Sequence, residues 1–100
     1  MSTATELLNK LTAEINEGQW GLLADHFSKG RVLEVRGVEL IAVGLSVALD
    51  RVAEVERWLA SGQLVPVDAE SAEAHSAELP IKLLIVQPFV LVQVTGQGLQ

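Results

Sequence analysis

The last long run of the chain, Ile81 to Val94, constrains the fold more than any other feature of the sequence. It reads IKLLIVQPFVLVQV, and both its odd and its even positions are mostly apolar. A strand with this pattern is covered on both of its faces. In a chain of 100 residues, that cover comes either from helices on both sides of a sheet or from a second copy of the protein. The run is therefore expected to be a central strand or an interface, with four interface candidates: Phe89, Val90, Leu91 and Val92.

Two residues in the middle of this run break its apolar pattern. Pro88 has no backbone N–H to donate to a sheet, so it predicts a bulge, a bend or an edge position. Gln87 places an amide in an apolar run, and an amide buried without hydrogen bonds costs about 1–3 kcal/mol. Its partner is expected to be either the backbone beside Pro88 or a bound ligand.

The rest of the chain alternates between helical and extended patterns. Residues 40–49 alternate bulky side chains with small ones, which predicts a strand, and residues 64–67 are expected to be extended because of Pro66. Strands are also expected at 31–36 and 81–94, and helices at 4–17, 19–28, 50–61 and 68–78. The order α-α-β-β-α-α-β predicts a single α+β domain over residues 1–100, with about four helices on a three-stranded, mainly antiparallel or mixed sheet. Residues 95–100 are expected to form a frayed tail.

Composition and charge exclude several classes of protein. The chain is 49% hydrophobic but only 4% aromatic, which predicts an aliphatic core. Its net charge of −6 opposes binding to nucleic acid or to an anionic membrane surface. It has no cysteine, no visible signal peptide, and no apolar run near the ~20 residues that span a bilayer. We therefore expect a cytoplasmic protein that binds neither nucleic acid nor membrane.

The chemistry-bearing residues do not form a known catalytic motif. His26 follows Asp25, but neighbours on a helix point in different directions, so His26 is interpreted as a surface or interfacial residue. His75 lies three positions before Glu78 in the acidic segment 68–78, a spacing that two metal ligands on a helix can use, although a solvated acidic face is the favoured interpretation. Ser46 lacks the sharp turn of a nucleophile elbow. The sequence therefore predicts no catalytic residue, no cofactor and no metal.

Three of the seven lysines and arginines form the one basic cluster of the sequence. Lys29, Arg31 and Arg36 lie close together in sequence, beside Gly30. In a chain of net charge −6, three such charges are compatible with a local contact to an anion, but not with a groove for nucleic acid.

Two segments of the chain resemble a family of short bacterial proteins of unknown function. These are the Trp-Leu-Ala-x-Gly segment in Trp58–Leu64 and the Val-Gln-Pro-Phe-Val-Leu strand in Leu84–Gln93. Trp20, Phe27 and the stretch Gly30–Leu33 fit the same family. The resemblance implies a stand-alone bacterial domain and supplies no catalytic residues.

Two hypotheses of different classes follow, and a third remains open. The leading hypothesis is a non-enzymatic, self-associating interaction module, expected to be a homodimer. The alternative is a small-ligand or metal-binding protein that uses His26, His75, Gln87 and nearby carboxylates. The third is an adaptor whose acidic segment 68–78 contacts a basic partner.

Overall fold

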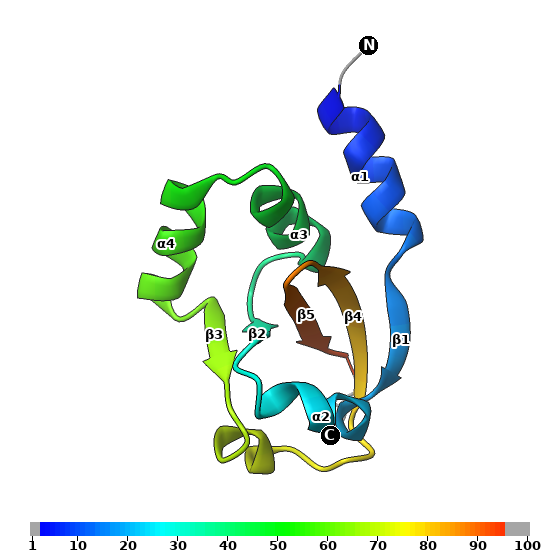
Figure 1. The fold of residues 1–100 in the computed structure, drawn as a ribbon, viewed down its shortest axis with the longest axis vertical. Helices are drawn as coiled ribbons and strands as arrows, with labels where there is room; N and C mark the ends of the chain where they lie inside the picture. The colour runs from blue at the N-terminus through cyan, green and yellow to red at the C-terminus, as the bar shows by residue number, and fades with distance from the viewer. Residues whose placement is uncertain (1–2, 96–100) are drawn as a thin grey trace.

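The computed structural model describes residues 3–95, which form a five-stranded mixed sheet with helices on both of its faces (Figure 1). The strand order is β1-β4-β5-β2-β3. Their bounds are β1 (Asn16–Gln19), β2 (Val32–Val35), β3 (Leu64–Val67), β4 (Pro80–Val86) and β5 (Phe89–Val94). The pair β2–β5 is parallel, and the other three pairs are antiparallel.

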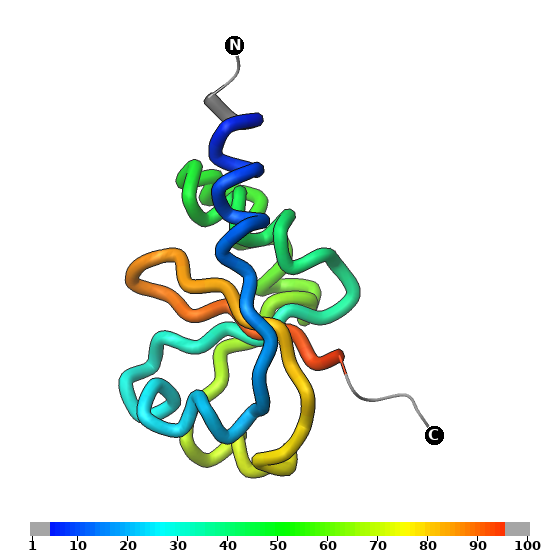
Figure 2. Tube along the Cα trace, turned by 90° about the vertical axis from the view of Figure 1, so that its right-hand side faces the viewer, coloured from blue at the N-terminus to red at the C-terminus, as the bar shows by residue number. Residues whose placement is uncertain are grey.

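The sheet separates two layers of helical structure. The helices are α1 (Thr3–Ala13), α2 (Ala24–Phe27), α3 (Leu40–Ala48) and α4 (Val52–Ser61), and the 3-10 turns are η1 (Trp20–Leu23) and η2 (Ser71–Ala74). In Figure 2 the sheet crosses the middle of the molecule, with α1, α3 and α4 above it and η1, α2 and η2 below. We call these sides the helical face and the turn face. Within residues 3–95, no helix combines the length and the hydropathy needed to cross a membrane.

Each face has its own hydrophobic cluster. On the helical face the buried members are Leu11, Val35, Leu40, Val43, Leu64, Leu84 and Leu91. On the turn face they are Trp20, Leu23, Phe27, Val32, Val67, Ala72, Ile81, Val90 and Val92. The apolar character of both sides of the run 81–94 is therefore satisfied by the chain's own helices and turns.

The run 81–94 forms two strands, which corrects the single strand expected from the sequence. Residues Gln87 and Pro88 form the turn of an antiparallel hairpin, and the peptide bond between them is cis. Ile81 of β4 pairs with Val94 of β5. The irregularity expected at Pro88 is therefore a reversal of the chain, because proline cannot donate to the ladder.

Residues 40–49 were expected to be a strand, and that prediction is wrong. Leu40–Ala48 is the helix α3, and its buried residues Leu40, Val43 and Gly44 follow helical spacing. In a run that is apolar almost throughout, alternation of bulky and small side chains does not decide between helix and strand. The sheet approaches α3 closely at one small residue, since a Cβ atom on Gly44 would lie 2.5 Å from Leu84 Cδ2.

Other boundaries also differ from the expected order, and the sheet has five strands rather than three. Asn16–Gln19 is an edge strand instead of the end of a helix, and the acidic segment 68–78 contains only the 3-10 turn η2. The helix expected at 50–61 is present as α4, and Gly62 ends it with a positive φ of 82°. Of the expected frayed tail, Thr95 donates its backbone N–H to Pro80 O, while 96–100 lie outside the described residues.

Candidate functional site

A polar pocket of about 430 Å³ lies at one edge of the sheet. Because β2 and β5 are parallel, their carboxyl ends meet at this edge. The segment after η2 closes the pocket from the turn face. The pocket is lined by Glu34, Val35, Arg36, Gly37, His75, Leu79, Gln93 and Val94.

Glu34 is the most unusual residue of the pocket, because its carboxylate is almost completely buried. Alternate residues of a strand share a face, so Glu34 points to the turn face together with Val32. Its side chain is only 8% exposed. Arg36 Nη2 donates to Glu34 Oε1 at 3.2 Å, and His75 Nε2 lies 3.6 Å from Glu34 Oε2. A buried carboxylate needs such partners, since removing it from water costs several kcal/mol.

His75 reaches Glu34 because the segment around it is anchored to η1. The indole Nε1 of Trp20 donates to Ala72 O at 2.9 Å, and the backbone N–H of Trp20 donates to Leu79 O at 2.9 Å. The imidazole of His75 meets the Trp20 ring edge-on, with 4.6 Å between the ring centroids. A buried tryptophan thus fixes both ends of the segment that carries His75.

Gln93 supplies the amide of the pocket. Its Nε2 donates to Val38 O at 2.6 Å, which holds the loop after β2 against β5. The loop turns at Gly37, whose φ of 77° favours glycine. The Oε1 atom of Gln93 remains an acceptor.

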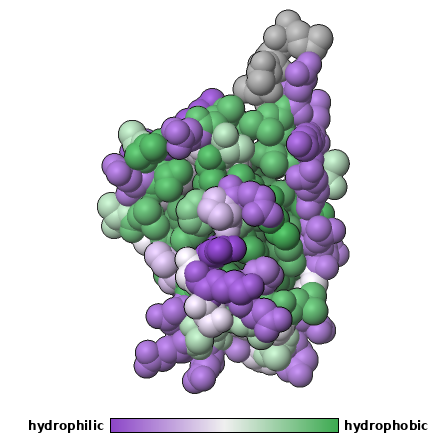
Figure 3. Space-filling view, viewed as in Figure 1, coloured by the Kyte–Doolittle hydropathy of each residue, from purple (hydrophilic) through white to green (hydrophobic). Residues whose placement is uncertain are grey.

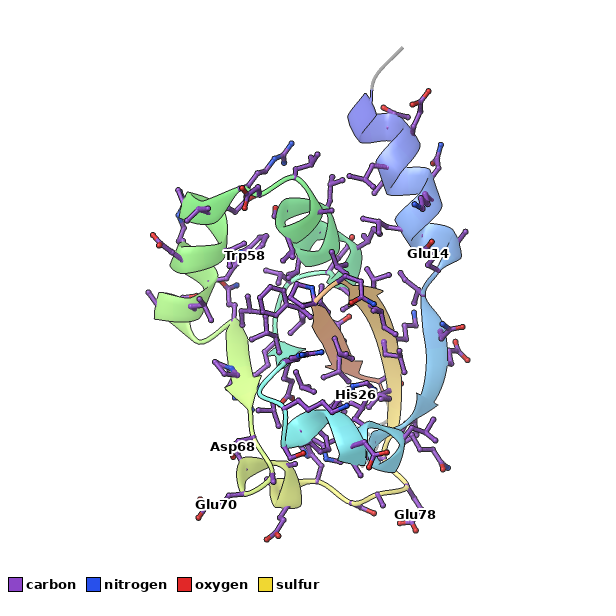
Figure 4. All side chains as sticks on the ribbon, viewed as in Figure 1. Glu14, His26, Trp58, Asp68, Glu70 and Glu78 are labelled. Carbon is purple, nitrogen blue, oxygen red and sulfur yellow. The ribbon has the colours of Figure 1, made fainter. Side chains whose placement is uncertain are left out.

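The residues singled out from the sequence are not brought together. His75 lines the pocket, whereas His26 lies on α2 and is not among the lining residues (Figure 4). Gln87 is exposed in the hairpin turn, so the expected cost of burying its amide does not arise. The carboxylates of the acidic segment lie at the end of the molecule that carries η2, as Figure 4 shows for Asp68, Glu70 and Glu78.

The carboxylate next to His75 is Glu34, and not the Glu78 suggested by their spacing. His75 follows η2 in extended conformation, so the helical spacing that would pair it with Glu78 is absent. Glu78 instead accepts a hydrogen bond from Ser76 Oγ at 2.7 Å. Among residues 3–95, no group of three or more His, Cys, Asp or Glu side chains is placed to hold a metal ion.

The sequence alone did not point to Glu34 or Gln93, and Arg36 stood out only as part of a basic cluster. A signal for Glu34 was present, because it is the one carboxylate inside the predicted strand 31–36 and it alternates with Val32. For Gln93, the hairpin had to be known before its position at the end of β5 could be assigned.

Three of the four interface candidates of the run 81–94 belong to the hydrophobic core. Val90, Leu91 and Val92 are at most 4% exposed. Phe89 is half-buried and lines a second hollow of about 360 Å³ between α3, α4, β3 and the hairpin, together with Val47, Val55 and Leu59. In Figure 3 hydrophobic surface gathers over α3 and α4, while hydrophilic residues cover the outer side of α1 and the end that carries η2. We call the hollow lined by Phe89, Val47, Val55 and Leu59 the apolar groove.

Just before η2, the side chain of Asp68 caps the first N–H group of this turn. The Ser71 N–H donates to Asp68 Oδ1 at 2.8 Å. Hydrogen bonds from Ser71 hold the pKa of the exposed Asp68 carboxyl below its usual value.

One comparison with known proteins identifies a family for this chain. A family model described as a protein of unknown function (DUF2288) matches residues 6–94. The chain is also similar to the NMR solution structure of PA1075 from Pseudomonas aeruginosa, with a TM-score of 0.77 and 26% identity, covering 100% of this chain and 95% of that one. No curated protein matches the sequence. The resemblance to a family of unknown function is confirmed.

Proposed function

Because the chain belongs to the DUF2288 family, whose function is unknown, we propose a function from the site itself: the domain binds a small molecule in the polar pocket without transforming it. The observation that carries this proposal is the buried carboxylate of Glu34, placed between His75 and Arg36 at the wall of the pocket. The pocket volume of about 430 Å³ lies within the range of small-molecule sites, roughly 300–1,000 Å³.

A purely structural role explains this cluster less well. Replacing a buried ion pair by apolar residues of similar size is often neutral or stabilising, so such a pair is weak support for stability. Here the cluster also faces a pocket, since the side chains of His75 and Arg36 are 30% and 56% exposed. A carboxylate that is kept buried next to accessible donors supports ligand binding.

The lining of the pocket supports binding rather than catalysis. The described lining residues include no serine, threonine or lysine. The two remaining candidates for a nucleophile or a base, Glu34 and His75, lie 3.6 Å from each other, and Glu34 also accepts a hydrogen bond from Arg36. Ser46 lies elsewhere, buried on α3, where its hydroxyl donates to Glu54 Oε1 at 2.6 Å.

The test is a titration followed by two-dimensional NMR of the labelled protein, using mixtures of small polar molecules. We expect some mixtures to shift the backbone amides of Val35, Gly37, His75 and Gln93, and we expect Arg36→Met to abolish these shifts. Arg31→Met is a matched control, because Arg31 is exposed and does not line the pocket. Shifts that survive Arg36→Met, or an absence of shifts with every mixture, would contradict the proposal.

Self-association is a second candidate function, and the apolar groove favours it. None of the residues of α4 is buried, although Val52, Val55, Trp58 and Leu59 share one side of it. Val52 and Leu59 remain 55% and 41% exposed. Two copies that cover this groove would remove from water the one interface candidate, Phe89, that the core leaves half-open.

Light scattering across a range of concentrations tests this candidate. We expect a homodimer that dissociates when Leu59 is replaced by Asp. Ala60→Asp is the matched control, because Ala60 is also exposed on α4 but does not line the groove. A monomer at every concentration would rule out the homodimer.

We also propose a cytoplasmic location. The sequence contains no cysteine, so folding needs no oxidising compartment. Detection of the protein in the soluble cytoplasmic fraction of its cell would support this location, and detection in a secreted fraction would contradict it.

A further inference from the structure

The donors and acceptors of the polar pocket are used to different extents. Both oxygens of Glu34 already face a basic side chain, Oε1 at 3.2 Å from Arg36 and Oε2 at 3.6 Å from His75. In the described part of the chain, by contrast, Arg36 donates one side-chain hydrogen bond, to Glu34. A guanidinium has five N–H donors, so most of those on Arg36 are available to a ligand.

This imbalance favours an acid over an amine. An ammonium group would have to compete with Arg36 and His75 for a carboxylate that is only 8% exposed. A carboxylate can instead take the free N–H groups of Arg36, whose planar fork matches its two oxygens.

The other lining residues of the pocket indicate which further chemical groups the acid carries. Leu79 and Val94 are half-buried and line the same pocket, so they offer apolar contact. The free Oε1 of Gln93 offers an acceptor to a hydroxyl or N–H group on the ligand. The pocket is therefore polar on one side and apolar on the other.

From this arrangement we infer that the ligand is a small organic acid, with its carboxylate on Arg36 and His75 and its apolar body against Leu79 and Val94. The inference rests on the proposed binding function of the same pocket, and it names the chemical class of the ligand.

The experiment compares three probes of similar shape and different charge by titration calorimetry: benzoate, benzamide and benzylamine. We expect the wild-type protein to bind benzoate at least about tenfold more tightly than the other two, a difference of about 1.4 kcal/mol. Arg36→Gln should weaken benzoate binding by about tenfold or more. The matched variant Arg31→Gln should leave it unchanged, because Arg31 lies outside the pocket.

The variant Glu34→Gln gives the most decisive test, because the direction of its effect on benzoate affinity is predicted. Removing the buried negative charge should raise the affinity for benzoate, because Glu34 repels an acid and competes for Arg36. If this variant does not give a native-like NMR spectrum, Arg36→Gln decides alone, since Arg36 is exposed and glutamine keeps a side-chain N–H donor at this position.

Two results would overturn the inference while leaving the binding function in place. One is tighter binding of benzylamine than of benzoate, with loss of that binding in Glu34→Gln. The other is no preference for benzoate when the NMR titration still finds molecules of other classes in the pocket. Failure of every molecule in both experiments would remove the binding function as well.

Discussion

The two faces of the sheet are covered in different ways. On the helical face, regular helices contribute aliphatic side chains, and Leu84 and Leu91 are completely buried beneath them. On the turn face, short turns and extended chain are held by individual hydrogen bonds, among them that of Trp20 Nε1 to Ala72 O. The buried carboxylate of Glu34 lies on this second side.

This difference indicates that stability and ligand binding depend on different faces of the sheet. Burial of aliphatic side chains stabilises the fold without directional contacts. Hydrogen-bonded turns place a few polar groups accurately, but they have less apolar packing and open locally at lower free energy. A binding site is therefore expected on the turn face, and the main stability on the helical face.

The largest expected effect is the loss of packing on the helical face. Leu84→Ala should lower the free energy of unfolding by about 2–5 kcal/mol, because Leu84 is fully buried beneath α3. Urea unfolding measures this change. The control Ile85→Ala alters the next residue of β4, which is 46% exposed, and equal losses in both variants would contradict the assignment of the core.

A second substitution tests the close approach of α3 to the sheet. Gly44→Leu should cost about 1–3 kcal/mol, because a side chain at Gly44 meets Leu84. Ala42→Leu, on the exposed side of the same helix, should have little effect. If both variants unfold at the same urea concentration as the wild type, α3 does not lie on β4 as described.

On the turn face, the expected effect is local. Trp20→Phe removes one of the two donors to Ala72 O, which keeps the 3.3 Å hydrogen bond from the His75 N–H, and the loss of one hydrogen bond costs about 0.5–1.5 kcal/mol. Amide hydrogen exchange should therefore accelerate most in residues 72–79, while α3 keeps its protection. If amide exchange accelerates equally on both faces, the helical face and the turn face do not open independently, which would contradict this prediction.

The smallest expected effect concerns the cap of η2. Because Ser71 lowers the pKa of Asp68 in the folded state, the ionised carboxylate stabilises the fold above its usual pKa. This contribution is lost as the pH falls through the lowered pKa. Asp68→Asn should therefore unfold at a slightly lower temperature than the wild type at neutral pH, and the difference should vanish in acid. A difference in unfolding temperature that grows in acid would contradict this prediction.

The sequence predicted some elements well because their signals are local. The strand 31–36 and the helix 50–61 are both present, and so are the α+β class and a mixed sheet. The number of four helices agrees only because α3 takes the place of the helix expected at 68–78. The strand expected at 40–49 is wrong, since a run that is apolar almost throughout fits both the helical and the strand period. The reversal at Pro88 turned one expected strand into two, and β1 has too few apolar residues to mark a strand.

The candidate site was harder to predict than the fold. His75 was identified, but its partner Glu34 lies on a distant strand, and only the tertiary structure places the two side chains 3.6 Å apart. The contact depends on Trp20, which anchors the segment of His75 through a backbone oxygen. Such pairings leave no periodic pattern in a sequence.

The stability of the double variant Glu34→Leu/His75→Leu tests the central claim most directly. If the polar cluster exists for binding, replacing the buried carboxylate and its imidazole by apolar side chains should leave the free energy of unfolding unchanged or raise it. The same variant should bind benzoate more weakly than Glu34→Gln does, because it also lacks the imidazole of His75. A loss of more than about 3 kcal/mol would show instead that the cluster holds the turn face together, and would contradict the account.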